Sequence, residues 1–118
     1  MGHVYDVGLD PDYGGVYDRG YPDRDPDMDK MWWEESESIL GFLYAAWATG
    51  EERFTRAALD IWEFMKRTIL DPEGEWHSLV TREGEPIEAT DPSDPLKCPY
   101  HSTRLVTLGV RMLDRLME

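Results

Sequence analysis

Residues 30–70 read KMWWEESESILGFLYAAWATGEERFTRAALDIWEFMKRTIL, and they determine the class of fold. Apolar side chains recur three and four positions apart, which is the spacing of one face of an α-helix. We therefore expect a helix over about 30–49, with Asp29 as its N-cap, and a second helix over about 51–70. Gly50 suits the left-handed conformation that ends a helix, and so short a link predicts an antiparallel helical hairpin.

The chain on the C-terminal side of this hairpin predicts a short β-hairpin and a third helix. Residues 76–81 and 86–88 have the composition of two strand arms, and Gly84 in the turn between them is free to adopt a positive φ. After a loop rich in Asp and Pro, the last helix is expected over about 101–117. Its apolar face consists of Leu105, Leu108, Met112 and Leu116.

The N-terminal segment predicts loops, because residues 1–31 are rich in Asp, Gly, Tyr and Pro, with one strand-like piece at 15–18. The fold class is therefore mainly α, in a single domain that covers residues 1–118. The apolar faces are too wide for three helices to bury, as in folds built from stacked helical hairpins. We expect either self-association or a missing N-terminal part to cover these faces.

Charge and cysteine content limit the partners. The formal net charge of −13 leaves no basic surface for nucleic acid or for an anionic membrane. No apolar stretch is long enough to span a bilayer, and no secretory signal is visible. Cys98 is the only cysteine, which excludes an internal disulfide and fits a reducing cytoplasm.

The segment Lys97-Cys98-Pro99-Tyr100-His101 carries the first candidate for chemistry. Pro99 disfavours helix, so the last helix begins near His101 and places its imidazole at a helix N-terminus. The positive end of the helix dipole favours a neutral imidazole, which can act as a general base. Arg104 follows one turn later on the same face. For His101 considered alone, a polar capping or surface role is the alternative.

Trp33 and Glu37 form the second candidate. They lie four positions apart, so they share one face of the first helix. An aromatic ring beside a carboxylate suits a sugar, because the ring stacks on C–H faces and the carboxylate accepts hydrogen bonds from hydroxyl groups. The alternative is a buried tryptophan next to a solvated glutamate.

Together and in this order, the motifs resemble the N-acylglucosamine 2-epimerase family, and its cellobiose 2-epimerase branch most. The resemblance extends over nearly the whole chain. The residues that carry it are Gly14-Gly15, Trp32-Trp33 with Glu37, Gly74-Glu75-Trp76, and the segment from Lys97 to His101.

The resemblance implies the C-terminal part of an (α/α)6 toroid, whose central cavity binds a mono- or disaccharide. It implies a sugar 2-epimerase or aldose–ketose isomerase that works through an enediolate, with no cofactor and no metal. In that scheme His101 is an acid/base, Trp33 stacks on the sugar, Glu37 binds or orients it, and Arg104 supports the site.

Three departures from the family pattern keep an alternative open. Leu96 occupies a position where the family has Trp, and Glu34-Glu35-Ser36 is more acidic than the usual residues. Family enzymes are also much longer, with a second acid/base histidine in their N-terminal part. Neither His3 nor His77 suits that role, because His3 lies beside the chain start and His77 in the expected hairpin. The alternatives are a non-catalytic carbohydrate-binding or interaction fragment, or an incomplete reading frame.

An acidic loop precedes the first helix. Three aspartates and a glutamate in it have the spacing of a calcium-binding loop: Asp23, Asp25, Asp27 and Glu34. Met28 occupies the position that requires glycine, and Pro26 interrupts the pattern. We expect a solvated loop at this place rather than a metal site.

Overall fold

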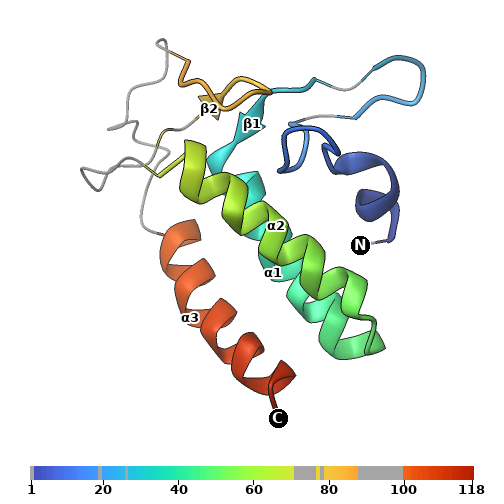
Figure 1. The fold of residues 1–118 in the computed structure, drawn as a ribbon, viewed down its shortest axis with the longest axis vertical. Coiled ribbons are helices and arrows are strands. Elements are labelled where there is room, and N and C mark those ends of the chain that lie inside the picture. The colour runs from blue at the N-terminus through green and yellow to red at the C-terminus, as the bar shows by residue number, and fades with distance from the viewer. Residues whose placement is uncertain (1, 19, 26, 71–76, 78, 88–99) are drawn as a thin grey trace.

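The protein, described by a computed structural model over residues 2–18, 20–25, 27–70, 77, 79–87 and 100–118, is dominated by three helices. These are α1 (Trp32–Thr49), α2 (Glu52–Thr68) and α3 (Tyr100–Leu116), and their ends lie within two residues of the predicted bounds. α1 packs against both α2 and α3, so it is the central helix (Figure 1). No helix in the described ranges is long and apolar enough to cross a bilayer.

The predicted hairpin of α1 and α2 is confirmed. Gly50 has a φ of 74° and donates its N–H to the carbonyl oxygen of Ala46 at 2.8 Å, which ends α1 in the left-handed conformation. The predicted N-cap is wrong: Met31 occupies that position, and no side chain caps the helix. α1 begins two residues later than expected because Lys30 and Met31 form a strand, β1 (Lys30–Met31).

A two-stranded antiparallel sheet joins β1 to β2 (Leu79–Val80), with Lys30 opposite Val80. The turn of the predicted β-hairpin is confirmed, since the Thr81 N–H donates to the carbonyl oxygen of Glu85 at 2.8 Å and Gly84 has a φ of 100°. The pairing of β2 with β1 was not predicted, because two residues are too short to show a strand periodicity. Residues 76, 78 and 88 of the expected hairpin lie outside the described residues.

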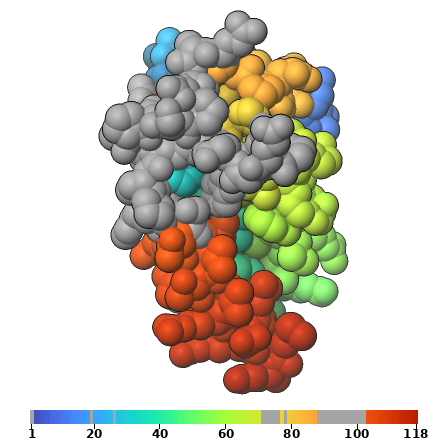
Figure 2. Space-filling view, turned by 90° about the vertical axis from the view of Figure 1, so that its left-hand side faces the viewer, coloured from blue at the N-terminus to red at the C-terminus, as the bar shows by residue number. Residues whose placement is uncertain are grey.

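The core lies between α1 and its two neighbours. Phe42, Ile61, Phe64 and Met65 are 0% exposed, and full burial of such a side chain stabilises a fold by about 1.5–3 kcal/mol. On its other side α1 receives apolar residues of α3, which extends along the lower part of the face shown in Figure 2, next to α2. α3 and the N-terminal segment thus lie on opposite sides of the α1–α2 hairpin (Figure 1).

The N-terminal segment packs against α1 and α2 on the side away from α3 (Figure 1). It contains a short π-helical turn, Val4–Gly8, where the sequence predicted a loop. Leu9 then pairs with Val16 in an antiparallel bridge, in agreement with the strand-like piece expected at 15–18. The Tyr5 ring packs edge-on against Phe42 and Phe54, with ring centroids 6.4 and 5.8 Å away. These contacts bring residues 3–18 to one side of α1.

Candidate functional site

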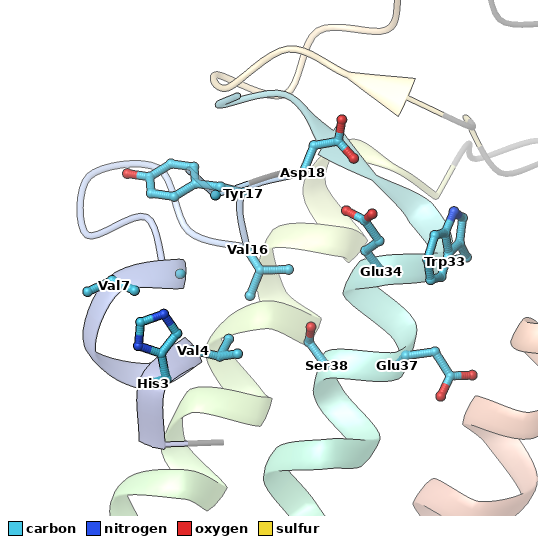
Figure 3. Close-up of a pocket in the computed structure, with 12 residues that line it drawn as sticks. His3, Val4, Val7, Val16, Tyr17, Asp18, Trp33, Glu34, Glu37 and Ser38 are labelled. Carbon is cyan, nitrogen blue, oxygen red and sulfur yellow. The ribbon is translucent and has the colours of Figure 1, made fainter. Parts of the chain in front are cut away.

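A cavity of about 400 Å³ lies between the N-terminal segment and the first turns of α1 (Figure 3). α1 provides one wall, and the chain around Val16 provides the facing wall. The residues of the α1 wall are Trp33, Glu34, Glu37 and Ser38, and those of the other side are His3, Val4, Val7, Gly8, Val16, Tyr17, Asp18 and Gly20. The lining combines an aromatic ring, carboxylates and aliphatic groups, which is the chemistry of a site for a small polar ligand.

Trp33 and Glu37, the two residues predicted from their spacing, line this same cavity. The Trp33 side chain is exposed rather than buried in the core, at 41% of its surface. Figure 3 shows both side chains on the side of α1 nearest α3, with Glu37 extending toward α3, whereas Glu34 extends toward Asp18. Trp33 and Glu37 therefore form the edge of the cavity nearest α3.

Arg104 joins this edge from α3. Its Nε lies 3.2 Å from the Glu37 carboxylate, and both side chains are partly exposed. A pair of this kind in contact with water contributes about 0–1 kcal/mol to stability, so its main effect is on position. It holds the first turns of α3 against the first turns of α1, which brings together two of the motifs that the sequence singled out.

His101 lies in the first turn of α3, since the helix begins at Tyr100. The expected position at a helix N-terminus is confirmed for its backbone. Its side chain lies outside the described residues, as do Leu96 and Cys98. Arg104 is one helical turn further along α3, so the backbone of His101 is on the same end of the helix as the Glu37 contact.

A buried ionic cluster of Asp10, Lys30 and Arg82 supports the N-terminal segment that forms the facing wall. The Lys30 ammonium group is 0% exposed and donates to Asp10 at 3.0 Å and to the carbonyl oxygen of Gly14 at 2.7 Å. Arg82 adds two hydrogen bonds to Asp10, at 2.8 and 3.2 Å. Burial alone raises the pKa of Asp10, but the hydrogen bonds from Arg82, Lys30 and the Asp12 N–H outweigh it and hold this pKa well below its usual range. The cluster joins the N-terminal loop, β1 and the turn after β2.

Glu35 is the second buried ionisable group beside the cavity. Its side chain is 0% exposed, and both of its carboxyl oxygens accept the Val16 N–H, at 3.0 and 2.9 Å. Burial raises the pKa of Glu35 to about 8, against the opposing effects of the Val16 hydrogen bond and the Lys30 charge. At neutral pH the group is therefore mostly protonated.

Sequence reasoning did not identify the facing wall or the residues that support it. Val16, Tyr17 and Asp18 carry no spacing that relates them to α1, and Lys30 and Glu35 resemble ordinary surface charges. One signal was available in Gly14-Gly15, which both have positive φ. Two adjacent glycines indicate a close approach of backbone to another group.

The acidic loop before α1 forms local hydrogen bonds. Among the described residues no group of three or more His, Cys, Asp or Glu side chains could hold a metal ion. The Asp27 carboxylate instead accepts a hydrogen bond from the Tyr21 hydroxyl at 2.8 Å.

Comparison with known proteins gives matches over most of the chain. The family model of the N-acylglucosamine 2-epimerases matches residues 2–103. The cellobiose 2-epimerase of Ruminococcus albus is 32% identical over 114 residues, which are 92% of this chain and 28% of the relative. The human N-acylglucosamine 2-epimerase is 30% identical over 94% of this chain and 27% of its own length. A crystal structure of a sugar epimerase from a ruminal bacterium superposes with a TM-score of 0.82 at 28% identity, covering 93% of this chain and 28% of that one. The chain thus spans less than a third of the length of these relatives.

Proposed function

This chain belongs to the N-acylglucosamine 2-epimerase family, and on this basis we propose that it provides one wall of the site of a sugar 2-epimerase or aldose–ketose isomerase. Its fold is that of the C-terminal part of an (α/α)6 toroid. The ligand is a mono- or disaccharide, as the names of the cellobiose and N-acylglucosamine epimerases among its relatives suggest. The single cysteine supports the cytoplasm as its place of action.

One observation carries the proposal. Trp33 and Glu37 line one cavity, and the Arg104–Glu37 pair brings the first turns of α3 beside it. The Trp33 ring offers a surface for the C–H face of a sugar, and Glu37 accepts hydrogen bonds from its hydroxyl groups. His101, in the first turn of α3, is then one turn from a residue that contacts the cavity edge.

The proposed reaction begins with the open-chain sugar. His101 removes the proton from C2, and the electron pair of that C–H bond forms the C1–C2 double bond of an enediolate with its charge on O1. Return of a proton to the other face of C2, as the C1 carbonyl re-forms, gives the epimer. Transfer of the O2 proton to O1, followed by return of the proton to C1 as the C2 carbonyl forms, gives the ketose. A second acid/base from outside this chain completes the epimerisation, because the two faces of C2 require groups on opposite sides.

Sugar binding by matched tryptophan variants tests the site. Trp33→Ala is expected to weaken cellobiose binding about 2- to 12-fold, since a stacked aromatic contributes about 0.5–1.5 kcal/mol and about 1.4 kcal/mol corresponds to tenfold. Trp47→Ala is the control, because Trp47 is also exposed, at 54%, but does not line the cavity. Equal affinities for both variants and the unmodified chain in an NMR titration would contradict the proposal.

A further inference from the structure

Two facing walls enclose the cavity, and they belong to segments that are not continuous in the chain. One wall is the first turns of α1, with Glu34 and Ser38, and the other is residues 16–18 of the N-terminal segment. The width of the cavity depends on the distance between these walls. Residues that hold them together therefore control how a ligand fits.

Glu35 makes this connection directly. It lies in the first turn of α1, between two residues of the cavity wall, and its buried carboxyl group accepts the N–H of Val16 in the facing wall. The Val16 side chain is 4% exposed, so no water is available to replace Glu35 as acceptor at low cost. Loss of this acceptor would leave the buried Val16 N–H unpaired, and the wall at residues 16–18 would lose its hydrogen bond to α1.

The backbone at Gly15 is shaped for this contact. A Cβ atom at this position would approach Glu35 Oε2 to 3.1 Å and Phe64 Cδ1 to 2.9 Å, and Gly15 has a φ of 78°. Only glycine allows the chain to pass this close to the carboxyl group. Lys30 makes a second contact with this segment, because its ammonium group donates a 2.7 Å hydrogen bond to the carbonyl oxygen of Gly14, the residue before Gly15.

We infer that Glu35 is a positioning residue of this cavity, which holds the wall at residues 16–18 against α1 through the Val16 N–H and so determines sugar affinity. The choice of a sugar as the ligand rests on the proposed function, but the hydrogen bond between Glu35 and the Val16 N–H does not. The charged groups that act on Glu35 are Lys30 on β1 and Glu34 on α1, while Phe64 of α2 lies against the backbone of Gly15.

The pH dependence of the Val16 amide chemical shift tests the hydrogen bond between Glu35 and Val16 without any ligand. In the full chain, the Val16 amide resonance is expected to titrate with a midpoint near the pKa of Glu35, about 8. Glu35→Gln keeps an acceptor oxygen but has no proton to lose, so the titration should disappear while the fold is kept. A Val16 resonance that shows the same pH dependence in the unmodified chain and in Glu35→Gln, over the whole pH range in which both are folded, would overturn the inference.

Cellobiose affinity tests the consequence. Glu35→Ala should weaken binding about 10-fold and speed hydrogen exchange at Val16 by a similar factor, whereas Glu35→Gln should stay within about 2-fold of the unmodified chain. Glu63→Ala is the control, since Glu63 is exposed and lies outside this cavity. Unchanged affinity in a folded Glu35→Ala protein would overturn the inference. If Glu35→Ala does not fold, the Val16 titration and Glu35→Gln decide it. Absence of sugar binding in the unmodified chain would instead reject the proposed function. The Val16 titration would still decide whether Glu35 holds the Val16 N–H.

Discussion

Asp10 is the residue on which the buried ionic cluster depends. Its side chain is 0% exposed and faces the equally buried Lys30 ammonium group, with Arg82 on its outer side. Two buried charges of this kind stabilise little as a pair, but loss of one leaves the other without compensation in a site of low polarity. Asp10 also accepts the N–H groups of Asp12 and Tyr13, so it shapes the loop that leads to Gly14-Gly15.

Asp10→Ala is therefore expected to lower the free energy of unfolding by about 3–5 kcal/mol in urea titrations at pH 7. The control is Asp114→Ala, at an exposed position on α3, with an expected change within about 0.5 kcal/mol. Because the pKa of Asp10 is held below its ordinary value of 3.8, its contribution is complete above that pH and is lost as the pH falls. Similar acid unfolding curves for Asp10→Ala and the unmodified chain would be inconsistent with this account.

At the level of residues, helical spacing was sufficient to place Trp33 and Glu37 on one face of a helix, while their roles in sugar binding stay a prediction. Trp33 and Glu37 share a cavity because they are four positions apart on one helix, and Arg104 meets Glu37 as a consequence of helix packing. Lys30 and Glu35 were not identified, since their partners are 20 and 19 residues away in the sequence. Contacts of that range follow from tertiary structure, which spacing along one element does not contain.

At the level of elements, glycines with positive φ decide how the helices and turns are joined. Gly50 and Gly84 were both predicted to have this conformation, with φ of 74° and 100°. A Cβ atom at Gly50 would meet no atom within 4 Å, whereas one at Gly84 would overlap the Thr68 methyl group at the end of α2. The turn after β2 is thus packed directly on α2, in contrast to the open turn between α1 and α2.

Gly84→Ala is expected to destabilise the fold by about 2–4 kcal/mol, from unfavourable φ together with steric overlap. Gly50→Ala should cost only about 1–2 kcal/mol, since its cost comes from φ alone. Thr68→Ser removes the methyl group but keeps the hydroxyl that donates to the Phe64 carbonyl oxygen at 2.8 Å. In thermal unfolding, Thr68→Ser should recover part of the cost of Gly84→Ala and none of that of Gly50→Ala. Equal effects of Thr68→Ser on both variants would refute this packing.

The boundaries of the elements show where sequence patterns stop being informative. Apolar periodicity and Gly50 predicted α1 and α2, but the start of α1 was placed at Lys30 because an Asp before an apolar run resembles an N-cap. The backbone of Lys30 and Met31 pairs with β2 instead. Such a short sheet follows from packing of the loops against each other, and no local pattern distinguishes it from a helix start.

At the level of the whole molecule, an apolar groove of about 280 Å³ lies between α2 and α3, with α1 at its base. Leu59, Val106 and Val110 in this groove are 49%, 62% and 54% exposed. An apolar surface of this kind is unfavourable in water and usually marks an interface. The wide apolar faces predicted from the sequence are thus partly uncovered in the part of the chain that the structure describes. The sequence indicated this only through the small number of helices available to cover them.

For the chain on its own we expect a second copy to cover this groove. Sedimentation velocity should show concentration-dependent association, and Val106→Lys with Val110→Lys should shift the protein to monomer. Met117→Lys is the control, because Met117 is 83% exposed and does not line the groove. A stable monomer of the unmodified chain at all concentrations would contradict self-association.

The central claim is that this chain provides a base at a sugar site, and proton exchange at C2 tests it most directly. Cellobiose, glucose and mannose are incubated with the folded chain in D2O, and the loss of the C2 proton signal is followed by NMR. The account predicts exchange with at least one sugar, its loss in His101→Ala, and unchanged sugar binding by that variant. Exchange that persists in His101→Ala, or a folded chain that binds sugar without any exchange, would contradict it and favour a non-catalytic carbohydrate-binding role.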